Sequence, residues 1–184
     1  MQQGIVRATQ MGRNQVHELN RDHVAAPIAE LLSGLRLELW RRLRETLAAW
    51  DVGPVYAGAF GSAARGDGGP DSDIDVLLVH PPLPGEEPPP RQRAKPIDLL
   101  GDRAATWPWR NAIPTAAQAE TWHAQVDELH AKVQRWTGNP LQLVDISVWQ
   151  WMGRSRTDPE LFREIEDDAV ALAGQLIPLP PRVR

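Results

Sequence analysis

Apolar positions along the chain predict a hairpin followed by a long helix. Two short strand-like runs on either side of Met11-Gly12 predict a β-hairpin over residues 4–20. From residue 27 to residue 50, apolar side chains recur at three- and four-residue spacing, which predicts one amphipathic helix with Pro27 in its first turn. The apolar positions of this helix are Ile28, Leu31, Leu32, Leu35, Leu39, Leu43, Leu47 and Trp50.

The remainder of the chain alternates between strand and helix patterns, which places the fold in the α/β (α+β) class. Residues 80–96 are rich in proline and predict an extended, exposed loop, and residues 97–114 show no periodicity. The predicted elements are strands at 55–60 and 74–79 with a short helix between them, a helix at 116–136, a strand at 141–148, a helix at 159–167 and a short apolar run at 169–172.

We expect two parts: an N-terminal hairpin, residues 1–24, and a main domain, residues 25–184, with a Pro-rich insertion at about 80–114. The hairpin resembles the wing of a winged helix-turn-helix domain, although the helices that precede a wing are missing. The resemblance implies that the chain begins partway through an ancestral module, or that Met1 is a misplaced start. An ordinary N-terminal hairpin is the alternative.

Composition excludes several kinds of chemistry. The 184 residues contain no cysteine, so disulfides, zinc–thiolate sites and cysteine nucleophiles are ruled out. With 42% hydrophobic residues the chain can bury a sizeable core, and its net charge of -4 argues mildly against tight non-specific binding of nucleic acid. No apolar run reaches membrane-spanning length and no signal peptide is evident, so we expect a soluble, cytoplasmic protein without membrane contact.

The segment between the strands at 55–60 and 74–79 contains the candidate chemistry. Gly61-Ser62 follows the first strand, and ten residues separate Ser62 from Asp73, which with Asp75 opens the second strand. Residues two apart in a strand point to the same side, so the two carboxylates converge. Carboxylates paired in this way repel each other unless a cation lies between them, and Mg²⁺ prefers such oxygen ligands. A glycine-bearing turn facing this pair predicts phosphoryl or nucleotidyl transfer.

Gly61-Ser62 with Asp73-Ile74-Asp75 at this spacing resembles the signature of the DNA polymerase beta nucleotidyltransferase superfamily, in particular its minimal prokaryotic members. The resemblance is strong over residues 54–80 and loose over 136–175. It implies the nucleotidyltransferase fold, a short mixed sheet flanked by helices. It also implies that Gly61 and Ser62 bind the phosphates of the nucleotide, aided by the amides of the following helix, and that Asp73 and Asp75 are catalytic and hold Mg²⁺.

Members of this superfamily usually have a third carboxylate, and Asp145 is the best candidate for this catalytic and metal-binding role. It interrupts the apolar strand at 141–148, where an unpaired charge would be costly. The alternatives are that Asp145 faces solvent or pairs with an arginine, or that Asp98 fills the role instead.

Six further positions keep two interpretations each. Arg65 either binds a phosphate of the nucleotide or lies solvated on the surface, and Ser72 either lines the nucleotide site or supports the turn. A group of tryptophans either stacks on a base or an acceptor or belongs to the core. These are Trp107, Trp109, Trp149 and Trp151.

The leading hypothesis is an enzyme that transfers NMP from an NTP, with ATP as the expected donor, to an acceptor hydroxyl and releases pyrophosphate. The resemblance implies proteins, tRNA ends and small molecules such as aminoglycosides as acceptor classes. It further implies a link to toxin–antitoxin pairs, with a partner protein or a homodimer. The alternative is a catalytically weak regulatory or nucleic-acid-binding module, which the wing-like hairpin favours.

Overall fold

The computed structural model describes residues 4–69, 71–86, 115–153 and 159–174. It divides the chain into two compact units, Met1–Trp40 and Arg41–Arg184, and each is described by itself. The predicted boundary between residues 24 and 25 falls inside the first unit. No helix in the described part of the chain is both long enough and apolar enough to cross a membrane.

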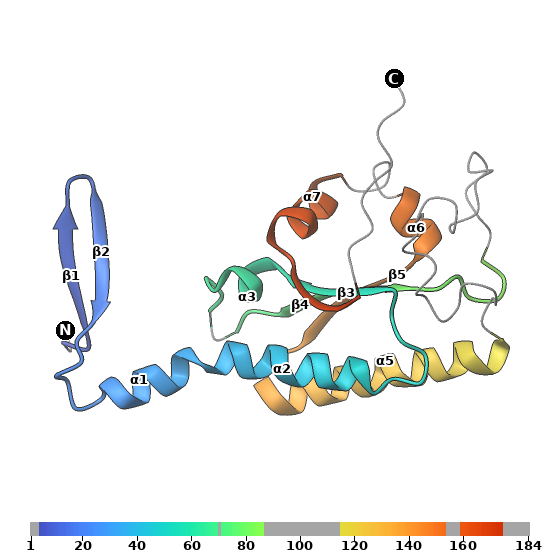
Figure 1. Ribbon diagram of the computed structural model, residues 1–184, viewed down its shortest axis with the longest axis horizontal. Coiled ribbons are helices and arrows are strands. Elements are labelled where there is room, and N and C mark those ends of the chain that lie inside the picture. Colours follow the sequence, from blue (N-terminus) through green and yellow to red (C-terminus); the bar gives the residue numbers. More distant parts are fainter. Residues whose placement is uncertain (1–3, 70, 87–114, 154–158, 175–184) are drawn as a thin grey trace, which may run out of the picture. The chain divides into compact units, whose positions relative to one another are not determined.

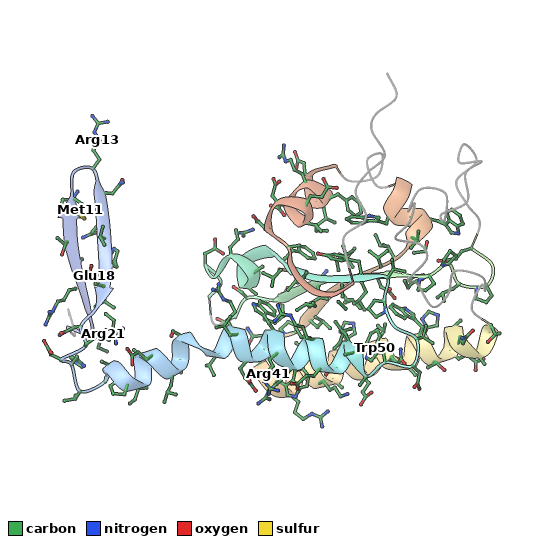
Figure 2. The ribbon with its side chains drawn as sticks, in the orientation of Figure 1. Met11, Arg13, Glu18, Arg21, Arg41 and Trp50 are labelled. Atoms are coloured by element: carbon green, nitrogen blue, oxygen red, sulfur yellow. The ribbon has the colours of Figure 1, made fainter. Side chains whose placement is uncertain are left out.

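The first unit opens with the predicted hairpin (Figure 1). Strands β1, Val6–Met11, and β2, Asn14–Leu19, pair antiparallel, with Met11 opposite Asn14. The two-residue turn between them is possible because Gly12 adopts a φ of 63°, which residues with a Cβ rarely adopt. Figure 2 shows Arg13 at the tip of this hairpin. The hairpin prediction is therefore confirmed.

The prediction of a single helix over residues 27–50 is wrong, because the structure contains two helices there. Helix α1, Ala26–Ser33, ends before Gly34, and α2, Leu35–Ala48, begins after it. The Gly34 amide donates to the Leu31 carbonyl, three residues earlier, across 3.1 Å, which is the pattern of a 3₁₀ turn and not of an α-helix. Glycine is also a poor residue for a helix interior.

The predicted apolar face is buried only in its second half. Leu43 and Leu47 of α2 are buried, whereas a group of apolar side chains before them is more than half exposed. This group comprises Ile28, Leu31, Leu32 and Leu35. Helical periodicity therefore predicted the secondary structure here but not which turns are covered.

The second unit is built on a mixed four-stranded sheet with the order β5-β4-β3-β6. Its strands are β3, Tyr56–Phe60, β4, Ile74–His80, β5, Leu141–Ser147, and β6, Val170–Gly174. Strand β3 is antiparallel to both β4 and β6, while β4 and β5 are parallel. This arrangement confirms the α+β class, and all but the first residue of the short apolar run at 169–172 lies in the edge strand β6.

Helices cover both faces of this sheet (Figure 1). On one face, Leu77 and Val79 of β4 pack in a cluster with Trp151 of α6, Val148–Gly153, and Ile165 of α7, Pro159–Asp168. On the other face lie α5, Ala116–Thr137, and the second half of α2. Because β3 and β4 are covered on both sides, their sequences are almost continuously apolar.

Helix α5 has clear signals at both ends and matches its prediction within one residue. The Thr115 hydroxyl accepts from the Gln118 amide, and the Gln118 side chain accepts in return from the Thr115 amide, which is a capping box. At the other end, Gly138 adopts a φ of 79° and closes the helix. The inward side chains Trp122, Leu129 and Val133 are fully buried.

Truncation of the buried face of α5 should destabilise the second unit. Leu129→Ala should lower the free energy of unfolding by about 2–5 kcal/mol, because it leaves a cavity at a fully buried position. The control Leu31→Ala, at a side chain that is 76% exposed, should change it by less than about 0.5 kcal/mol. Urea unfolding followed by tryptophan fluorescence measures both, and equal losses would contradict the assignment of the core.

Candidate active site

The Gly61-Ser62 turn and Asp75 are brought together by the pairing of β3 with β4. Phe60, the last residue of β3, lies opposite Asp75 in the antiparallel register. The chain then turns into the short helix α3, Gly61–Arg65. Gly61 adopts a φ of 68°, and a Cβ at this position would overlap the Asp75 carboxylate. Only glycine allows the backbone to approach the carboxylate this closely.

Asp73 and Asp75 form an acidic pair at the start of β4. Asp73 is exposed just before the strand, and Asp75 is half-buried at its second position. The pKa of Asp75 is raised above its ordinary value, mainly by burial and next by the charge of Asp73. The charge of Glu164 on α7 raises it further, while Arg65 lowers it. An ionised pair that is held in this way is a suitable set of oxygen ligands for a divalent cation.

The loop that leads to Asp73 is held by backbone contacts. The Ser72 hydroxyl accepts from the Gly69 amide across 2.8 Å, so Ser72 supports this turn. Asn139, in the connection between α5 and β5, donates to the Ser72 carbonyl across 2.7 Å. The Ile74 amide donates to the Pro140 carbonyl across 3.0 Å. These contacts fix the position at which Asp73 enters the site.

Ser62 and Arg65 are both on α3 but differ in their contacts. The Ser62 carbonyl accepts from the amides of Gly66 and Asp67, while its hydroxyl lies next to Gly68. The Arg65 guanidinium donates to Asp67 across 3.2 Å and to Asp168 across 3.0 Å. In this structure, Arg65 is therefore engaged by carboxylates.

The structure does not bring Asp145 to the acidic pair. Strands β4 and β5 are parallel, with Asp75 opposite Gln142 and Leu78 opposite Asp145. Paired residues point to the same face and residues three apart to opposite faces, so Asp145 lies on the face away from Asp75. The register in which β5 pairs with β4 is thus the physical reason why Asp145 does not reach the acidic pair.

Asp145 instead joins a separate group of side chains on the α5 face. The Trp122 indole donates to the Asp145 carboxylate across 3.1 Å, and Nε2 of the buried His80 lies 4.0 Å from it. The predicted cost of an unpaired charge in this strand is thus offset by the indole donor of Trp122 rather than by the predicted site.

The remaining predictions concern a third carboxylate and the four tryptophans, and only some of these residues lie in the described part of the chain. Within the described residues, no group of three acidic or histidine side chains is arranged to hold a metal ion, so the acidic pair stands without a third carboxylate. Trp151 is fully buried against Phe162, and Trp149 packs against the same cluster, which favours their core interpretation. Asp98, Trp107 and Trp109 lie outside the described residues.

Among families of known proteins, the one described as nucleotidyltransferase domain matches residues 40–133, about half of the chain. The chain belongs to this family. The matched span contains Gly61-Ser62, Asp73 and Asp75, and it confirms the family expected from their spacing. A nucleotidyltransferase domain implies an NTP as the donor of an NMP group. No curated protein gives a significant match to the chain.

Two further acids that pattern reasoning missed lie beside the candidate site. Glu164 and Asp168 both lie on α7, which falls outside the matched span. Their spacing of four residues places them on one side of a helix, and this spacing was the one feature of the sequence that indicated they act together. Only the packing of α7 beside α3 shows that this side faces Asp75 and Arg65.

Replacing Gly61 should disturb both the fold and the site. Gly61→Ala should cost at least about 1 kcal/mol of stability, because alanine is strained at this φ and its Cβ would displace the Asp75 carboxylate. The control Gly53→Ala has open space around the added methyl and should be close to neutral. Thermal unfolding compares the two variants, and a neutral Gly61→Ala would contradict the close approach described here.

The raised pKa of Asp75 predicts a pH-dependent effect on stability. The folded state binds the proton more tightly than the unfolded state, so ionisation of Asp75 opposes folding as the pH rises above its ordinary value of 3.8. Asp75→Asn should therefore be the more stable protein at pH 7 without divalent cations, by less than about 1 kcal/mol after solvent screening. The difference should shrink as the pH falls toward 3.8. Urea unfolding with EDTA present measures it, and a less stable variant at pH 7 would reject this account.

Proposed function

We propose that this protein is a Mg²⁺-dependent enzyme that transfers NMP from an NTP to an acceptor hydroxyl. One observation carries the proposal: Gly61 approaches Asp75 so closely that only a residue without a side chain fits. A phosphate chain lying on the Gly61-Ser62 turn would therefore lie directly beside the acidic pair. ATP is the donor that we propose to test first.

The residues of the turn have a direct role in binding the donor. Gly61 leaves its backbone accessible, because no side chain stands between it and a phosphate oxygen. The Ser62 hydroxyl, one residue further, can donate a hydrogen bond to the same phosphate group. These two contacts would hold the phosphates without adding positive charge, so they leave charge neutralisation to another group.

Asp73 and Asp75 are the residues that would hold Mg²⁺. Burial and mutual repulsion raise the pKa of Asp75, and a cation between the two carboxylates would relieve both effects. When bound, the ion supplies charge stabilisation at the phosphate under attack. In our proposal Asp145 is not among the ligands, since it lies on the other face of the sheet.

The reaction exchanges a phosphoanhydride bond of the NTP for a phosphoester bond to the acceptor. The acceptor oxygen forms a bond to the α-phosphorus and loses its proton, and the bond from that phosphorus to the bridging oxygen breaks. Pyrophosphate then leaves. The acceptor classes to test are a protein, a tRNA and a small molecule. A role in a cytoplasmic toxin–antitoxin pair, with a partner protein or a second copy of the chain, belongs to the same proposal.

Titration calorimetry with ATP, GTP, CTP and UTP, with and without Mg²⁺, tests the donor site. One nucleotide should bind only with Mg²⁺. Asp73→Asn should weaken this binding by at least about tenfold, because it removes a charged ligand of the cation. Asp71→Asn makes the same change at an exposed residue two positions earlier and should leave binding unaltered.

Two results would contradict the proposal. The first is a folded wild-type protein that binds none of the four nucleotides, which would favour the alternative of a regulatory module. The second is Mg²⁺-dependent binding that survives in Asp73→Asn. Where binding is found, incubation with the α-labelled nucleotide and each class of acceptor shows which one receives the label.

A further inference from the structure

A single guanidinium links three segments around the candidate site. Arg65 is the last residue of α3, and it contacts Asp67 in the turn toward Asp73 and Asp168 at the end of α7. The hydrogen bond to Asp168 is the largest of the effects that raise the pKa of Arg65. The same guanidinium also lowers the pKa of Asp75. Arg65 thus lies among three carboxylates from three elements.

The sheet register places Asp168 beside the phosphate-binding turn. Ala59 of β3 pairs antiparallel with Val170 of β6. Gly61 follows Ala59 by two residues, and Asp168 precedes Val170 by two, so the two strands extend to these residues at the same end of the sheet. On its other side, β3 pairs Phe60 with Asp75. The turn is therefore flanked by Asp75 on one side and Asp168 on the other.

Asp168 is also an unusual residue for the C-terminal end of a helix. It is the last residue of α7, where unsatisfied carbonyl groups create a negative potential that favours basic residues. No basic residue lies in the last turn of α7. An acid at this position is unfavourable unless a cation from another element compensates it, and Arg65 does so. A local rule broken at one point and compensated across the fold is typical of a functional constraint.

We propose that Asp168 is a positioning residue for nucleotide binding, which acts by holding Arg65 and through it α3 and the Asp67 turn. This inference rests on the proposed function. Arg65 and Asp168 have side-chain exposures of 41% and 30%, and ion pairs this exposed contribute little to global stability. The pair therefore matters for where Gly61-Ser62 lies relative to Asp73 and Asp75, more than for whether the domain folds.

Asp168→Asn tests the proposal, because it keeps the shape of the side chain and removes its charge. The affinity for the Mg²⁺–nucleotide complex should fall about fivefold, while the melting temperature changes little. Asp168→Glu, which keeps the charge, should recover part of the affinity. Once Arg65→Met has removed the partner, adding Asp168→Asn should have no further effect. Glu128→Gln, which breaks the remote Lys132–Glu128 pair, is the matched control and should leave affinity unchanged.

Amide hydrogen exchange provides a second readout that needs no nucleotide. Residues 61–67 should exchange faster in Asp168→Asn than in the wild type, and those of α5 should not. Unchanged or tighter nucleotide binding in a folded Asp168→Asn protein overturns the proposal, and tighter binding would make Arg65 a phosphate ligand that Asp168 restrains. Unchanged exchange at 61–67 overturns it as well. A wild-type protein that binds no nucleotide contradicts the proposed function, and the exchange result still decides the positioning role.

Discussion

The close approach of the Gly61 backbone to the Asp75 carboxylate is the constraint on which the site depends. It requires a glycine with a positive φ, a β3 strand that ends at Phe60, and a register that places Phe60 opposite Asp75. A shift of one residue in that register would turn Asp75 into the apolar face under α5. The buried side chains of β3 and β4 hold the register, so the core positions the site.

Charge around the site is unevenly distributed. Acids from several segments lie around the site: Asp73 just before β4, Asp75 in β4, Asp67 in the turn, and Glu164 and Asp168 on α7. The Arg65 guanidinium contacts Asp67 and Asp168. Burial, and then the charges of Asp73 and Glu164, raise the pKa of Asp75. Such a group of acids is suited to a divalent cation that carries a phosphate chain. In contrast, the acid on the far face, Asp145, is satisfied by Trp122 and lies near His80. The sheet thus separates the acidic pair Asp73 and Asp75 from Asp145, although each of these acids stands at or within an apolar strand.

Much of the second unit was predictable, and the reasons are local. Strands β3 and β4 are continuous apolar runs, and α5 has a capping box at one end and a glycine at the other. The pair Asp73 and Asp75 followed from strand periodicity alone. The break at Gly34 was missed, because the apolar spacing continues across it. The exposure of Leu31 was missed because periodicity does not reveal which turns have a neighbour.

The sequence by itself determined most elements of the second unit, the glycine-bearing turn, the acidic pair Asp73 and Asp75, and the family to which the chain belongs. These depend on interactions between residues that are close along the chain. Only the tertiary structure decided which acids join them. The register of β5 placed Asp145 on the opposite face, and the packing of α7 brought Glu164 and Asp168 to the site. Strand register and helix packing depend on contacts between distant residues, and the spacing of side chains along one element does not encode them.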